Sequence, residues 1–338
     1  MFLIPDAAPA PAAVRRTLPG RLAIAATLVL GAGAAFANPD AWRAEWPQTD
    51  FSRSTVDLSE IISGGPPKDG IPAIWEPEFR SVDSETRLDD REPVMTLEIE
   101  SDARAYPVRY LMWHEIVNDE VGGMAVAVTF CPLCNSAMAF EAQVDGEHRS
   151  FGVSGKLRHS DMVMYDRETE SWWQQATGQG IVGHHAGDRL ESVPAWMESW
   201  AEFRSRNPDG LVLDEPNWRR AYGQNPYVGY DTSERPFLYR GEDPPHGISP
   251  LARVVRVEDR AWTFERLRTE GEIVEAGVRL NWTSGQASAL DSESIAAGRD
   301  VGTVRVRDAA TGDDLPHDIP FAFAFHAFWP DGTWMLGD

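Results

Sequence analysis

Alternating apolar and polar positions in the middle of the chain predict a series of β-strands. In "PVMTLEIE", Pro93–Glu100, the side chains of Met95, Leu97 and Ile99 fall on one face, which is the pattern of a half-buried strand. A second strand is predicted for Met124–Phe130, and "DEVGG" just before it predicts a hairpin turn. "SAMAFEAQV" alternates in the same way and predicts a further strand. The pattern therefore favours a mainly β fold, a β-rich α+β protein.

Few helices are expected. The only convincing helical pattern in the first half is "PAWMESWAEFRSRNP", Pro194–Pro208, where Trp196, Trp200 and Phe203 share one face and prolines mark both ends. We therefore predict one helix across this segment.

Two stretches of the first half are echoed in the second half in the same order. "ARAYPVRYL" corresponds to "DRAWTFERL", and "WAEFRSRNPDGLVL" corresponds to "FAFHAFWPDGTWML". Such an echo predicts two tandem modules related by duplication, residues 91–215 and 216–338, of which the second has no cysteine pair. Residues 38–90 are too rich in Pro and Gly for a long helix or a central strand, so they predict an arm anchored by burial of Trp75 and Phe79.

The first residues have the pattern of an export signal. Arg15 and Arg16 precede the apolar run "LAIAATLVLGAGAAF", and small residues predict cleavage near Ala37. The run is shorter than the roughly 20 residues that span a bilayer, and no later stretch is long enough. Residues 1–37 are therefore predicted to be a signal peptide of the secretory or the twin-arginine type. The mature chain is expected to be periplasmic or extracellular, without a transmembrane segment.

Charge excludes one class of partner. The formal net charge is −22, and removing a leader that holds three Arg and one Asp makes it −24. A surface this acidic repels the phosphates of nucleic acid, so no nucleic-acid partner is expected.

The two cysteines of the chain, Cys131 and Cys134, lie in "VTFCPLCNSAMAF". A strand precedes them, Pro132 favours a turn and a strand follows, so the pair is predicted at the tip of a hairpin rather than at the start of a helix. Such a knuckle turns both sulfur atoms toward one coordination sphere, as in zinc-ribbon sites. The sequence therefore predicts a transition-metal site.

Two thiolates leave at least one ligand to be supplied by other residues. Two thiolates with imidazole and a thioether suit copper, whereas imidazole with water or a carboxylate suits zinc. The candidate ligands beside the cysteines are His114, His159, Asp161 and Met138. Each histidine has a second interpretation: His114 as a core histidine bonded to a backbone carbonyl, and His159 as a loop residue. "GHHAG", His184 and His185, is interpreted as a solvated turn.

Other uses of the cysteine pair stay open. A disulfide within so small a loop contributes little stability, yet exported cysteines tend to oxidise. A thiol–disulfide oxidoreductase that acts on a protein redox partner is the second hypothesis, and a non-catalytic binding module is the third. No catalytic residue is assigned. "DRETESWW", from Asp166, could supply catalytic carboxylates, but a capped turn made by Asp166 and Thr169 is favoured. No phosphate loop or dinucleotide motif is present, so no nucleotide cofactor is expected.

Three segments, "AYPVRYLMWHEIVNDEVGGMAVAVTFCPLCNSAMAF", "FGVSGKLRHSDMVMYDRETESWW" and "GIVG", resemble the bacterial and archaeal family called domain of unknown function 3179. The resemblance is clear from Pro93 to about Leu213 and loose elsewhere. It implies a fold and a site, but no activity. It marks as motif positions, without assigned roles, His114, Cys131, Cys134, Asp161 and Asp166.

Overall fold

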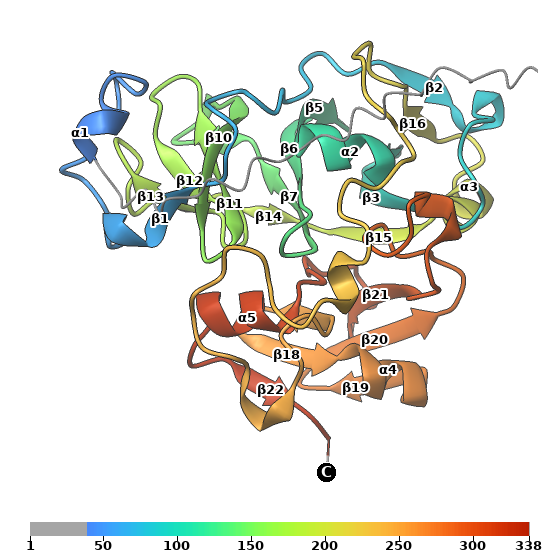
Figure 1. The fold of residues 1–338 in the computed structure, drawn as a ribbon. Helices are drawn as coiled ribbons and strands as arrows, with labels where there is room; N and C mark the ends of the chain where they lie inside the picture. The colour runs from blue at the N-terminus through green and yellow to red at the C-terminus, as the bar shows by residue number, and fades with distance from the viewer. Residues whose placement is uncertain (1–38, 338) are drawn as a thin grey trace, which may run out of the picture. The chain divides into compact units, whose positions relative to one another are not determined.

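Strands provide most of the regular structure in the computed structural model, which describes residues 39–337 (Figure 1). The predicted mainly β class is confirmed. The predicted signal peptide lies outside the described residues. All described residues belong to one compact unit, so the two predicted modules pack together rather than as separate bodies.

Three sheets hold the strands of the arm and the first module, in the orders β1-β10-β11-β12-β13, β14-β7-β6-β5 and β15-β3-β4-β16-β2. Their bounds are β1 Ile61–Ser63, β2 Phe79–Ser81, β3 Pro93–Ile99, β4 Asp102–Pro107, β5 Ile116–Val121, β6 Met124–Cys131, β7 Ser136–Glu141, β10 Phe151–Arg158, β11 Asp161–Asp166, β12 Trp172–Gln174, β13 Gln179–Val182, β14 Ser192–Val193, β15 Ala195–Ser199 and β16 Leu211–Leu213. The strands predicted from alternation, β3, β6 and β7, are confirmed, as is the turn between β5 and β6.

Smaller sheets complete the described fold. The second module has two three-stranded sheets, β17-β18-β22 and β19-β20-β21, and the first has a two-stranded ribbon, β8-β9. Their bounds are β8 Gln143–Val144, β9 Glu147–His148, β17 Val254–Val257, β18 Arg260–Thr263, β19 Glu272–Glu275, β20 Val278–Thr283, β21 Thr303–Asp308 and β22 Thr333–Met335.

The α-helices of residues 39–337 are short. They are α1 Pro39–Trp42, α2 Val108–His114, α3 Trp200–Arg206, α4 Phe264–Glu270 and α5 Ala322–Phe328. No helix within these residues is long and apolar enough to cross a membrane.

The prediction of a single helix across Pro194–Pro208 is wrong for the first half of this segment. Residues 195–199 form β15, which pairs antiparallel with β3, and the helix begins only at Trp200. Ser199 has an extended backbone, its side chain accepts from the Glu202 amide, and the Glu202 side chain accepts from the Ser199 amide. This capping box sets the helix start, because it satisfies donors that the first helical turn leaves unpaired.

The arm follows the edges of two sheets, as β1 and β2 are both edge strands. Of its two predicted anchors, Phe79 is half-buried and packs against the large hydrophobic core, whereas Trp75 is 37% exposed. Trp46, which was not predicted as an anchor, is fully buried. Lys68 supports the docked arm, since its Nζ lies 2.7 Å from Glu170 Oε1 and over the rings of Trp46 and Tyr165. The arm is therefore held by an aromatic cluster and by the ammonium group of Lys68 that lies on it.

The echoed segments adopt the same order of elements in both modules. In the first, β3 pairs antiparallel with β4, α2 follows, and β16, which comes after α3, pairs parallel with β4. In the second, β17 pairs antiparallel with β18, α4 follows, and β22, which comes after α5, pairs parallel with β18. The sequence echo thus corresponds to a repeated arrangement of strands and helices.

One large hydrophobic core joins the modules. It contains Val128, Phe130 and Cys134 of the first module together with Phe321 and Phe323 of the second. Because the apolar face of the cysteine hairpin is part of this core, the second module lies against the candidate site.

Candidate metal centre

The cysteines lie at the tip of the β6–β7 hairpin, as predicted: Cys131 is the last residue of β6, and Cys134 lies in the four-residue connection that follows. Cys131 pairs with Ser136 across the hairpin, and the Cys134 amide donates to the Cys131 carbonyl at 3.3 Å. Asn135 has a φ of 53°, in the left-handed region that Asn tolerates better than most residues. This tight turn brings the two cysteines to the same end of the hairpin.

A second hairpin places Asp161 beside them. β10 and β11 are joined by His159 and Ser160, whose φ values of 50° and 66° give a two-residue turn with both residues left-handed. Asp161 is the first residue of β11. The Ser160 carbonyl lies 3.9 Å from Cys131 Sγ. Two hairpins distant in sequence therefore meet at their tips.

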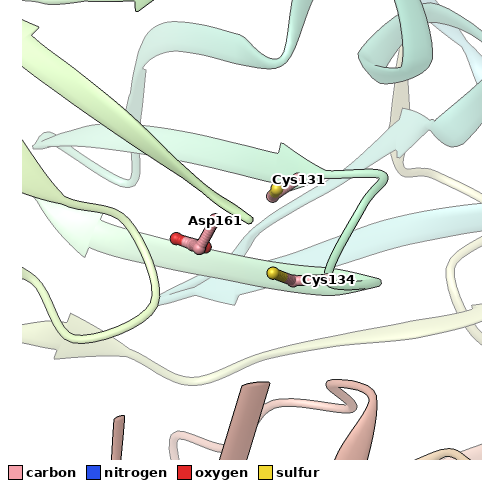
Figure 2. A group of neighbouring side chains, drawn as sticks. All are labelled: Cys131, Cys134 and Asp161. Atoms are coloured by element: carbon pink, nitrogen blue, oxygen red, sulfur yellow. The ribbon is translucent and has the colours of Figure 1, made fainter. Parts of the chain in front are cut away.

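The three side chains form a compact donor group. The Sγ atoms of Cys131 and Cys134 and one carboxylate oxygen of Asp161 all lie within 4.8 Å of one another, and all three residues are buried (Figure 2). Both cysteines are free thiols. Ligand atoms around a tetrahedral zinc ion stand about 3.3–3.8 Å apart, as follows from bonds of about 2.0–2.3 Å. Small side-chain movements would bring this group to that geometry.

Asp161 has one oxygen without a partner. Its Oδ2 accepts from the Gln174 side chain and from the Ala176 amide, both at 3.1 Å. Its Oδ1 is buried and has no hydrogen-bond partner. A buried carboxylate oxygen without a partner carries a free-energy cost, which a bound cation would remove.

Burial controls the charge state of the group. It raises the pKa of Cys131, and raises the pKa values of Cys134 and Asp161 well above their usual range. Glu115 is also buried, and its pKa rises to about 8. Its carboxyl group is close enough to add to the rise at Cys131 and Asp161. Without a cation these groups hold their protons, and a divalent ion would displace them.

The second module closes over the cysteine turn. Asp318 is buried, and its carboxylate accepts from Ser136 Oγ at 2.6 Å and from the Ala137 amide at 2.9 Å. The Asn135 side chain donates to the Ile319 carbonyl at 2.7 Å, and the Phe321 amide donates to the Cys134 carbonyl at 2.8 Å. These bonds hold the cysteine turn against residues 318–321 of the second module.

His114 and His159, predicted as ligands, are not part of the group. His114 Nδ1 lies 2.7 Å from the Pro72 carbonyl and Nε2 lies 2.6 Å from Tyr222 Oη, so both ring nitrogens have partners. A carbonyl beside Nδ1 requires a proton there, which leaves Nε2 to accept from the tyrosine. His159 instead lies 3.5 Å from a Glu60 oxygen and against Phe328. The expectation that the His114 ring faces the thiols is therefore corrected.

The turn at Asp166 and the solvated turn at His184–His185 were both predicted from the sequence, and the structure agrees fully with the first only. Asp166 forms the expected capped turn: its Oδ1 accepts from the Thr169 amide at 2.7 Å, and its Oδ2 accepts from Trp173 Nε1 at 2.9 Å. The solvated-turn prediction is wrong for His185, which is 1% exposed and bonds Asp188 through Nδ1. His185, Asp188 and Asp145 make a second donor group, although both carboxylates are exposed.

Glu115 and Asp318 lie at the site but were not predicted from the sequence. Glu115 stands between His114 and Ile116 in an otherwise apolar stretch, and a lone carboxylate among buried positions was the available signal. Asp318 has no comparable local signal, because its contacts with the cysteine turn span the two modules.

Comparisons with known proteins identify the family but no activity. A family model described as "Protein of unknown function (DUF3179)" matches residues 68–332, and this range includes most of the second module as well as the first. No curated protein and no solved structure matches the chain. The chain belongs to the DUF3179 family.

Proposed function

We propose that this protein is an exported metal-binding protein that holds one zinc ion through Cys131, Cys134 and Asp161. The observation that carries the proposal is the convergence of three buried donors within 4.8 Å, one of them a carboxylate with an unpartnered oxygen. Two sulfur ligands and one oxygen ligand are within the set that zinc accepts in proteins, and a water or backbone atom would supply the fourth position.

The donor set favours zinc over copper. Imidazole was expected as a ligand of either metal, and both His114 ring nitrogens have other partners. The copper site was expected to use a thioether as well. The Met138 sulfur accepts from Arg256 Nη2 at 3.5 Å, so it is also engaged. A carboxylate is a harder ligand than either, and it suits zinc better than cuprous copper.

Burial favours a structural role for the ion. A bound ion would connect the turn between β6 and β7 to the turn between β10 and β11, and the Asp318 bonds would then hold that unit to the second module. Structural zinc sites are usually closed by four protein ligands and this group supplies three, but an ion bound by buried side chains would still contribute directly to the free energy of folding.

Metal analysis of the mature chain, purified without a histidine tag, tests the proposal. We expect about one zinc per chain in the wild type and loss of zinc in Cys131→Ser and Cys134→Ser. Asp161→Asn should weaken binding, measured by competition with a chromogenic chelator. Asp188→Asn is the matched control, because it removes a carboxylate from the other donor group. Wild-type protein that neither contains zinc nor binds added Zn²⁺ would refute the proposal.

A second candidate is thiol–disulfide exchange with a protein partner, which one observation favours. The two sulfur atoms are free thiols within 4.8 Å of each other, as a dithiol that reduces a disulfide requires. In that reaction the dithiol gives two electrons and two protons as the partner's disulfide is reduced to two thiols. The thiols are buried and their pKa values raised, which disfavours direct attack. A Cys134→Ser trap that enriches a mixed disulfide would support this candidate, and a trap without any enriched partner would count against it.

Two further expectations remain proposals. Export rests on the signal pattern of residues 1–37. Duplication of an ancestral module is supported by the matched order of β3, β4 and α2 with β17, β18 and α4, and by the parallel pairing of β16 and β22.

A further inference from the structure

The first part of the second module lies on the cysteine site. Residues 222–239, here called the tyrosine strap, include four of the seven tyrosines of the chain. Their rings pack against the same hydrophobic core as the cysteines.

Hydrogen bonds join the strap to both hairpin tips. Tyr230 Oη donates to the Leu133 carbonyl at 2.9 Å, inside the turn that carries the two thiols, and accepts from the Phe237 amide at 3.2 Å. The Ser160 hydroxyl donates to the Phe237 carbonyl, next to Asp161. Tyr222 bonds His114 as described above. The strap therefore contacts Leu133, which precedes Cys134, and Ser160, which precedes Asp161.

One buried charge network fixes the strap to the rest of the second module. Asp231 is 5% exposed and accepts from Arg253 at 2.9 Å, Ser288 at 2.5 Å and Arg299 at 2.7 Å. An ion pair of this kind is costly to break, because either partner left alone would be a buried charge. Separation of the site from the strap should therefore occur at the tyrosine hydroxyls rather than at Asp231.

The rest of the strap has little regular structure. Within residues 222–239, the regular elements are the 3-10 helix Tyr230–Thr232 and an isolated bridge from Gln224 to Ser294. Val228 and Phe237 are 58% and 46% exposed. Segments that are not part of a sheet and carry exposed side chains open locally at lower free energy than paired strands.

We infer that the tyrosine strap is a cover over the thiol pair, and that separation of the Cys131–Cys134 turn from Tyr230 is the step that admits a metal ion or a thiol reagent. Loss of the Tyr230 hydroxyl removes one donor to the turn and one acceptor within the strap. The part of this inference that concerns metal entry rests on the proposed zinc site. The cover over the thiols does not, since it can be measured in metal-free protein.

The test is the rate of cysteine alkylation by N-ethylmaleimide in chelator-treated mature protein under native conditions. When the turn closes faster than it is alkylated, the rate follows the open fraction. Loss of the partly buried bond to Leu133 and of the exposed bond from Phe237 should raise that fraction in Tyr230→Phe about 5-fold to 30-fold. Tyr239→Phe is the matched control, because its hydroxyl bonds the Glu242 carbonyl close by in sequence, and its labelling rate should stay at the wild-type value.

A second control separates local opening from general destabilisation. Tyr165→Phe removes a hydrogen bond of 2.7 Å to Asp69, in the arm rather than the strap, and should leave the labelling rate unchanged. Equal rates in wild type and Tyr230→Phe would overturn the inference. Equal acceleration in Tyr230→Phe and Tyr165→Phe would overturn it as well. If the wild type binds zinc, Tyr230→Phe should also release it to a chelator faster by a similar factor, whereas a chain without zinc would refute only the proposed function.

Discussion

Glu115 should make the stability of the metal-free protein depend on pH. Burial raises its pKa from 4.5 to about 8, so the folded chain keeps this proton at pH values where the unfolded chain has lost it. Its contribution is therefore fully present below about pH 4.5 and is lost as the pH rises toward 8. At about 1.4 kcal/mol per pH unit, the wild type should lose about 5 kcal/mol relative to Glu115→Gln across this interval.

Urea unfolding of both proteins at a series of pH values from 5 to 9, with a chelator present, measures this effect. The free energy of unfolding of Glu115→Gln minus that of the wild type should rise with a slope of about 1.4 kcal/mol per pH unit up to pH 8, then level off. Glu147→Gln is the control, because the Glu147 side chain is 73% exposed and its substitution should give a constant difference. A Glu115→Gln difference that is also constant with pH would refute the assignment of a buried, protonated carboxyl group.

Two other substitutions test the structure around the site. His114→Phe should lower the free energy of unfolding by about 1–3 kcal/mol, because the Tyr222 hydroxyl and the Pro72 carbonyl lose their partner. The zinc stoichiometry should not change. Loss of zinc at unchanged stability would show that His114 is a ligand. Lys68→Met should weaken docking of the arm by about 1–2 kcal/mol, measured as faster hydrogen exchange around Trp46. Unchanged exchange there would show that the Lys68 contacts do not hold the arm.

The elements nearest the cysteines could be predicted from local sequence. Alternation set β6 and β7, and Pro132 between the two cysteines indicated the turn, because a period of two and a residue that restricts φ act on the backbone within a few positions. The capping box at Ser199 is also a local sequence feature. It was missed because Trp196 and Trp200 share one face of a helical pattern, which placed the predicted helix start before Ser199. Pairing with β3 extends the residues before Ser199, and this pairing is a non-local effect.

The sequence by itself determined a mainly β chain, a two-cysteine turn and the family. Only the tertiary structure decided which side chains surround that turn. Asp161 lies beside the thiols because a second hairpin packs against the first. His114 is not a candidate ligand, because its two ring nitrogens bond the Pro72 carbonyl and the Tyr222 hydroxyl. A coordination sphere joins residues far apart in the chain, so it depends on how sheets pack, and periodicity carries no information about that packing.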